Sequence, residues 1–140
     1  MAKEKYLVGV YDDLRQEGDA YKIYMGDANY LGTFYTEPEF DLYSLSRKYP
    51  GLVKDGSTSI LLEVFEVNDI TLLGMDYYEG CSEFDPYMNI YNRIEIDSPW
   101  GPCFIYEYNR VIINKPRIDS GDWFRFKREV KKKFNKISQN

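Results

Sequence analysis

An apolar run near the middle of the chain places the strongest constraint on the fold. The run predicts a β-strand over residues 59–67, and its apolar side chains alternate between both faces: Ile60, Leu62 and Val64 on one, Leu61, Phe65 and Val67 on the other. A strand that is apolar on both faces is stable only when both are covered. The chain must therefore form layers around this strand. Glu63 lies among these side chains and needs a partner, which we expect to be Arg93 or a tyrosine hydroxyl.

The other elements follow from the same alternation and from turn residues. Strands are predicted at about residues 6–11, 30–35, 42–45, 90–97 and 103–108. Residues 14–19 are interpreted as a polar loop or the start of a short helix, and residues 48–58, rich in Pro, Gly and Ser, as a long loop. Asn68 is a good N-cap for a helix through Ile70, Leu73 and Tyr77 that ends at Gly80. The fold class is α+β, with mostly antiparallel strands and two main helices.

The second main helix is predicted over about residues 122–137. It carries an apolar stripe at helical spacing, formed by Trp123, Phe126, Val130, Phe134 and Ile137. Residues 125–140 hold seven basic side chains and one acidic one, whereas the preceding residues have a net charge of −11. We therefore expect a domain over residues 1–124 and a basic helical extension over 125–140. Three interpretations of the basic face stay open. It is exposed to solvent, it docks on the acidic body of the same chain, or it binds a partner protein.

Composition excludes several classes of function. The chain has no histidine, which removes His-based triads and His metal sites, and its two cysteines are too few for a structural zinc site. Phosphate-loop, dinucleotide-binding and nucleophile-elbow motifs are absent from the sequence. The acidic body argues against nucleic acid as the main partner. Without an apolar run of about 20 residues or a signal-peptide pattern, a soluble cytoplasmic protein with reduced thiols is expected.

Ordinary motifs occur in a distinctive order. These are Val10-Tyr11-Asp12-Asp13-Leu14-Arg15, Tyr49-Pro50-Gly51-Leu52, Leu62-Glu63-Val64-Phe65, Met75-Asp76-Tyr77-Tyr78-Glu79-Gly80, Tyr91-Asn92-Arg93, Phe104-Ile105-Tyr106 and Ser120-Gly121-Asp122-Trp123. Over residues 6–124 this order resembles the γ-glutamylcyclotransferase-like family, including its AIG2-like γ-glutamylamine cyclotransferase branch. The resemblance implies a small mixed or antiparallel β-barrel with flanking helices and a pocket at its mouth.

The resemblance also implies a reaction and a site. A γ-glutamyl α-amino group would attack its own side-chain amide, so that 5-oxoproline and a free amine or peptide are released. The family's general base falls on Glu79, and its substrate-binding loop falls on Tyr11, Asp12, Asp13 and Leu14. Further substrate-binding candidates are Tyr49, Tyr91 and Arg93. The reaction needs no metal and no cofactor, and the expected partner is a small molecule bearing a γ-glutamyl or amine group.

The loop departs from the family pattern at two positions. Asp12 and Asp13 replace the usual Gly and Ser/Thr, and two carboxylates would repel a substrate carboxylate and favour a cationic group. This departure supports an alternative hypothesis, a catalytically inactive or diverged module that binds a small amine-bearing molecule. Taken alone, Glu79 is a solvated surface acid, the two aspartates form a plain turn, and Arg93 makes an ion pair. A third hypothesis is a protein-interaction domain that uses the basic helix.

Overall fold

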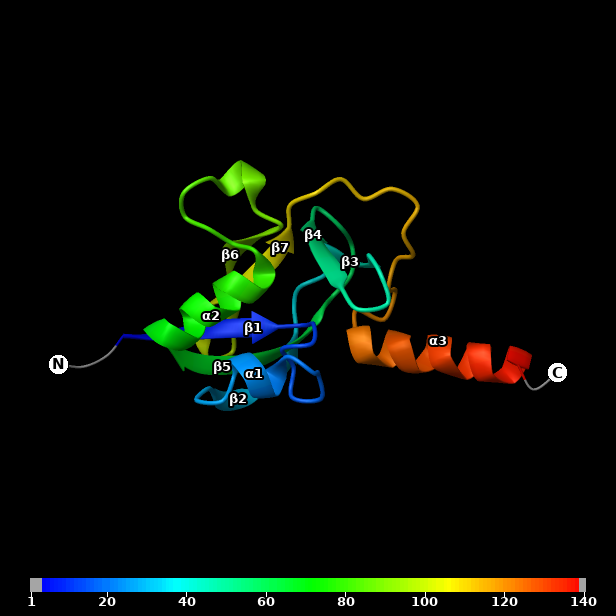
Figure 1. Cartoon of the computed structure of the whole chain (residues 1–140), viewed down its shortest axis with the longest axis horizontal. Coiled ribbons are helices and arrows are strands. Elements are labelled where there is room, and N and C mark those ends of the chain that lie inside the picture. The colour runs from blue at the N-terminus through cyan, green and yellow to red at the C-terminus, as the bar shows by residue number, and fades with distance from the viewer. Residues whose placement is uncertain (1–3, 139–140) are drawn as a thin grey trace.

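The computed structural model describes residues 4–138 (Figure 1). Its strands are β1 Lys5–Val10, β2 Asn29–Tyr35, β3 Phe40–Ser44, β4 Pro50–Lys54, β5 Leu61–Asn68, β6 Tyr91–Ser98 and β7 Gly101–Tyr108. Its helices are α1 Tyr21–Tyr24, α2 Asp69–Glu79, the short 3-10 helix η1 Pro86–Met88, and α3 Trp123–Ser138. Among these described residues, no helix is long and apolar enough to cross a membrane.

Strand β5 lies inside a five-stranded sheet with the order β2-β5-β1-β7-β6. It pairs antiparallel with both β1 and β2, while β1 runs parallel to β7 and β7 pairs antiparallel with β6. Both faces of β5 are covered, as its sequence predicts. Phe65 and Val67 pack into a core cluster with α2, and Ile60 and Leu62 pack into a second cluster with Trp123 and the β3–β4 hairpin. The α+β class is therefore confirmed.

The predicted closure into a barrel is not seen. β2 and β6 are the two edges of the five-stranded sheet, and β3 and β4 pair with each other as a separate two-stranded sheet. Past β2, the ladder with the segment before β5 is reduced to an isolated bridge between Phe40 and Thr58, and Pro38, between β2 and this bridge, has no N–H to donate. Leu42 and Leu52 of the hairpin pack into the core cluster that also contains Leu62 of β5.

One local prediction was wrong, and the choice left open for residues 14–19 is settled in favour of a loop. The segment predicted as a long loop contains β4, which pairs antiparallel with β3 from Ser44↔Pro50 to Phe40↔Lys54. Pro50 is tolerated because it is the first residue of its strand. The polar segment after β1 is a series of turns, and the short helix α1 begins only at Tyr21. In both segments the turn residues alone are compatible with more than one local structure, and contacts with distant residues decide which one forms.

Helix α2 has the ends that the sequence predicts. The Asn68 side chain accepts a hydrogen bond from the Thr71 N–H at 2.9 Å, and Gly80 ends the helix in the left-handed conformation, with φ of 64°. The inner face of the helix buries Leu72, Met75 and Glu79, together with the polar side chains of Thr71 and Asp76. Its outer face bears the stripe of Ile70, Leu73 and Tyr77, and this stripe is exposed.

A buried ion-pair network joins three distant segments. The guanidinium of Arg15 lies 3.3 Å from Glu63 on β5 and 2.9 Å from Asp122 before α3, and it stacks on the Phe124 ring. Glu63 also accepts a hydrogen bond from the Gln16 N–H at 2.7 Å. The predicted partner of Glu63 was therefore wrong: it is Arg15 instead of Arg93 or a tyrosine. Arg15 follows the turn after β1, which places it over β5, whereas Arg93 lies on the edge strand β6.

The same network sets the charge state of Asp122. Burial by itself raises the pKa of this carboxyl, but hydrogen bonds from Arg15 and from the Arg125 N–H outweigh burial and lower it below the ordinary value of 3.8. A carboxyl whose pKa is lowered by folding stabilises the fold above its unfolded pKa, and this stability is lost as the pH falls through the folded pKa.

Replacing Arg15 tests this network. Arg15→Met leaves the carboxylates of Glu63 and Asp122 buried without their cation, so we expect the free energy of unfolding to fall by about 3–5 kcal/mol. The difference from wild type should be largest above pH 3.8 and shrink at lower pH, because Asp122 then takes up a proton. Urea unfolding at several pH values measures it. Arg117→Met, which removes an exposed ion pair with Asp119, is the matched control and should leave stability unchanged. Equal effects of the two variants would contradict the role of Arg15.

Candidate active site

The turn that follows β1 brings the backbone and a carboxylate together. The Leu14 N–H donates to Asp12 Oδ1 at 3.0 Å, and the Arg15 N–H donates to the Asp12 carbonyl at the same distance. Gly18 closes the loop, because a Cβ at this position would lie 2.1 Å from the Asp13 carbonyl oxygen. Asp12 is only 7% exposed, so its side chain points into the protein and not to solvent.

Glu79 is the inner partner of Asp12. It is the last residue of α2, it is 4% exposed, and its carboxyl is hydrogen-bonded to that of Asp12. Burial raises the pKa of Glu79 well above its ordinary value, and the negative charge of Asp12 raises it further. Burial also raises the pKa of Asp12, while the hydrogen bond with Glu79 acts in the opposite direction. When two carboxyl groups are in such contact, the negative charge of one disfavours ionisation of the other, so they titrate as a coupled pair.

Buried tyrosines surround the carboxyl pair and tie it to β4 and β7. The Tyr11 hydroxyl donates to the Tyr106 carbonyl at 2.7 Å and accepts from the Leu52 N–H at 3.3 Å. The Tyr91 hydroxyl donates to the Pro50 carbonyl at 2.7 Å. Burial is the main cause that raises the pKa of the Tyr11 and Tyr91 phenols, and nearby negative charges, including that of Glu79, raise it further. Both phenols therefore stay neutral hydrogen-bond donors.

Three residues form the more open side of the cluster. Tyr78 is half-buried, and burial is the largest cause that raises the pKa of its phenol. The negative charges of Asp12, Glu79 and Asp13 raise this pKa further, so all three carboxylates lie near the Tyr78 side chain. The Asp13 carboxylate also lies 3.7 Å from Lys127 Nζ on α3. Tyr49 is half-exposed. Tyr78 is not identified by sequence pattern, because its neighbour Tyr77 follows the apolar spacing of the helix, and only the fold shows which of the two tyrosines faces inward.

The remaining predicted residues lie elsewhere. The Leu14 side chain is fully buried in the core, so this residue offers the cluster its N–H and not its side chain. Arg93 forms an ion pair with Asp76 at 2.9 Å and stacks on Phe104, in a groove between α2 and residues 81–92. The Tyr106 hydroxyl donates to the same carboxylate at 2.7 Å. The structure thus brings Tyr11, Asp12, Asp13, Tyr49, Tyr91 and Glu79 into one region, and it occupies Arg93 with a protein carboxylate.

The chemistry of the cluster is that of proton transfer. A buried carboxyl whose pKa is raised can, once it is ionised, accept a proton from an amine and return it to a leaving group. Within residues 4–138, no group of three or more Cys, Asp or Glu side chains is arranged to hold a metal ion. Cys81 and Cys103 are both free thiols, and burial raises the pKa of Cys103 to about 11.

The sequence and the fold correspond to a known family. The family model described as gamma-glutamyl cyclotransferase, AIG2-like, matches residues 8–125, which is most of the chain. The chain therefore belongs to the gamma-glutamyl cyclotransferase, AIG2-like family.

Relatives support the same assignment. The chain is 38% identical over 119 residues to a Vibrio cholerae protein named "Putative gamma-glutamylcyclotransferase", with 85% of this chain and 96% of that protein covered. It is 32% identical over 115 residues to the gamma-glutamylcyclotransferase family protein YtfP of Escherichia coli K12, covering 81% of this chain and 92% of the relative. An uncharacterized protein from Pyrococcus horikoshii has the same fold, with a TM-score of 0.70 and 27% identity over 89% of this chain and 94% of that one.

Removing the charge of Asp12 tests the coupled pair. Folding raises the pKa of the Glu79 carboxyl above its ordinary value of 4.5. Such a carboxyl lowers the stability of the fold as the pH rises from the unfolded pKa to the folded pKa. In Asp12→Asn the amide still accepts from the Leu14 N–H and can donate to Glu79, so we expect a smaller loss of stability above pH 4.5 than in wild type. Thermal unfolding over a pH series measures the difference. Asp13→Asn is the matched control, and identical pH profiles of wild type and Asp12→Asn would overturn the coupling.

Proposed function

We propose that the protein cyclises a γ-glutamyl amine or peptide to 5-oxoproline, with Glu79 as the general base. The observation that carries this proposal is the buried Glu79 carboxyl at the end of α2, in contact with the loop of residues 11–14. Family membership supports the reaction class, and the raised pKa of Glu79 suits a group that both accepts and returns a proton.

The reaction can be followed atom by atom. Glu79 takes a proton from the substrate α-ammonium, which leaves a neutral amine. The amine nitrogen attacks the γ-carbonyl carbon, so a carbon–nitrogen bond forms and the carbonyl oxygen becomes negative. The attacking nitrogen now carries a positive charge and one surplus proton. The tetrahedral intermediate collapses when Glu79 gives its proton to the leaving nitrogen and the bond to that nitrogen breaks. The ionised Glu79 then takes the surplus proton from the ring nitrogen and passes it to water. The products are 5-oxoproline and the free amine. Because the attack is intramolecular, holding the substrate curled supplies a large part of the rate.

The loop after β1 is proposed to stabilise the negative oxygen. The Leu14 N–H points into the cluster, since it donates to Asp12 Oδ1. A substrate oxygen that displaces the Asp12 carboxylate would meet this donor, and backbone donors of this kind stabilise developing negative charge. The neutral hydroxyls of Tyr11 and Tyr91 hold the β4 backbone in place beside the loop.

Asp12 also supports a second candidate function. Its carboxylate already fills the position at the Leu14 N–H and touches Glu79, so two acidic groups stand where a neutral Gly would leave open space. This arrangement suits a cation. The second candidate is therefore a module that binds a small amine without cleaving it.

An assay for 5-oxoproline separates the two candidates. Purified protein is incubated with a panel of γ-glutamyl amines, γ-glutamyl dipeptides and glutathione, and released 5-oxoproline is quantified. We expect turnover by wild type and a loss of about 100-fold or more in kcat/KM in Glu79→Gln. Glu37→Gln, an exposed acid far from the cluster, is the matched control. If folded wild type turns over none of the panel but binds amines in calorimetry, and Asp12→Asn abolishes that binding, the second candidate replaces the first.

The pH profile gives an independent prediction. Glu79 must be ionised to act as base, so kcat/KM should rise with pH through the raised pKa of the carboxyl pair. Removing the neighbouring negative charge in Asp12→Asn lowers that pKa, so the ascending limb should move to lower pH. A limb that stays in place in Asp12→Asn would show that the titrating group is not coupled to Asp12.

A further inference from the structure

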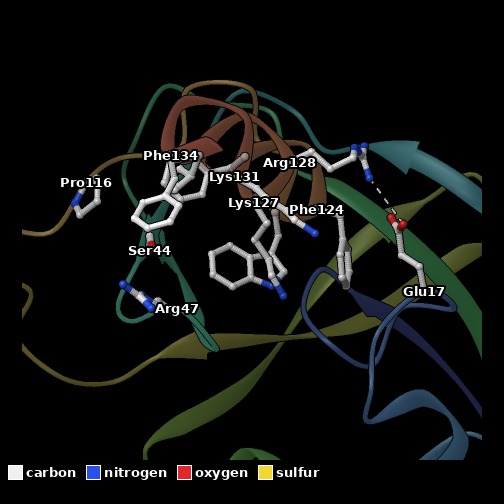
Figure 2. A pocket seen from close by; sticks show the side chains of 12 residues that line it. Glu17, Ser44, Arg47, Pro116, Phe124, Lys127, Arg128, Lys131 and Phe134 are labelled. Atoms are coloured by element: carbon white, nitrogen blue, oxygen red, sulfur yellow. Dashed lines mark hydrogen bonds and ion pairs between the residues drawn. The ribbon is translucent and has the colours of Figure 1, made fainter. Parts of the chain in front are cut away.

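Helix α3 has an apolar stripe that the body of the protein leaves uncovered. Its first residue, Trp123, is buried, but the helix extends away from the sheet (Figure 1), and the later part of the stripe, Val130, Phe134 and Ile137, is exposed. Phe134 is 67% exposed. A pocket of about 720 Å³ runs along this part of the helix, and in Figure 2 Phe134 lies toward Ser44 and Pro116 of the body. Lys127, Arg128 and Lys131 line the same pocket, so the stripe has a basic border.

Helix α2 has the complementary surface. Its outer face exposes Leu73 by 71% and Tyr77 by 82%. Together with Phe84 they form the apolar lining of a groove of about 800 Å³ between α2 and residues 81–92. Asp76, Glu83 and Arg93 are its charged lining residues, and Asp76 and Arg93 pair with each other. Contiguous apolar surfaces of this kind on a soluble domain mark interaction sites. The groove therefore has one more acidic than basic lining residue, whereas the stripe of α3 has a basic border.

One chain cannot bring these two surfaces together. Figure 1 shows α2 and η1 toward one end of the molecule, while α3 extends from the other. The ion pairs of α3 with its own body come from its first turns, where Lys127 lies near Asp13 and Arg128 lies near Glu17. The exposed part of the stripe is therefore open to another molecule.

Charge decides which molecule fits. Residues 125–140 carry a net charge of +6, so two α3 helices packed against each other would repel. The rest of the chain carries −11, which opposes approach to an anionic membrane. A second copy of this chain offers an acidic body and an apolar groove on the same surface. An amphipathic helix that lays its apolar face in such a groove, with opposite charges at the rim, is a common mode of recognition.

We propose that α3 of one copy lies in the groove between α2 and residues 81–92 of a second copy. The anchors would be Val130, Phe134 and Ile137, which recur at spacings of four and three residues on one face. Their basic neighbours on α3 would face Glu83 at the groove. When the exchange is reciprocal, the same contact occurs twice and closes a dimer with two-fold symmetry.

The oligomeric state of the full chain tests the proposal. Sedimentation velocity is measured over a concentration series at about 50 mM and about 500 mM NaCl. Wild type should form a dimer whose dissociation constant increases at the higher salt concentration. Phe134→Glu on α3 and Leu73→Glu on α2 should each increase it about tenfold or more, because each buries an unpaired charge at the contact. Val111→Glu makes the same kind of change at an exposed residue outside both surfaces and should leave the dimer intact.

Mixing the two variants shows which surfaces touch. Phe134→Glu keeps an intact groove and Leu73→Glu keeps an intact helix, so an equimolar mixture should recover one of the two contacts and associate more tightly than either variant alone. Far-UV circular dichroism confirms that both variants are folded. No recovery in the mixture would overturn the helix-in-groove contact, as would a monomeric wild type at low salt. Binding of monomeric wild type to phosphatidylserine vesicles, lost in Phe134→Glu, would assign the stripe to a membrane surface instead and so also overturn it.

Discussion

Arg15 is the cation that holds the candidate site to the rest of the fold. It follows the turn of residues 11–14, it reaches Glu63 on the strand that is buried on both faces, and it reaches Asp122 at the start of α3. Buried charges are costly unless each finds a partner with good geometry, so this network has few alternative arrangements. Its main effect is on geometry: it fixes the loop after β1 against the centre of the sheet. The position of Asp12, and with it the environment of Glu79, depends on that loop.

The carboxyl pair shows how burial and charge act together on one group. Glu79 is buried among aromatic side chains at the C-terminal end of a helix, where the helix dipole also disfavours a negative charge. Asp12 adds a second carboxyl in contact with the first. A lone exposed glutamate would be ionised at neutral pH and too weak a base to take a proton from an ammonium group. A raised pKa gives the group the affinity for a proton that general base catalysis requires.

Helix α2 has two faces with apolar residues, and its sequence does not show which of the two is buried. Its inner face carries Leu72, Met75 and Glu79, and its outer face carries Ile70, Leu73 and Tyr77. Both faces contain apolar residues at helical spacing. The inner face is covered by the core of the same chain, and the outer face is open to another molecule. The groove beside the outer face also holds the Asp76–Arg93 ion pair, which lies next to the buried Tyr106.

The sequence by itself determined the α+β class, the doubly buried strand, the caps of α2 and the order of motifs that carries the family resemblance. These features follow from local alternation and from capping residues, which act over a few neighbours. The sequence also pointed to Glu79 and the loop of residues 11–14. Only the tertiary structure decided that Glu63 pairs with Arg15, that residues 50–54 form a strand, that the sheet stays open, and that Tyr78 and not Tyr77 faces the carboxyl pair. Each of these depends on contacts between segments far apart in the chain, where several partners satisfy the local pattern and only packing selects one.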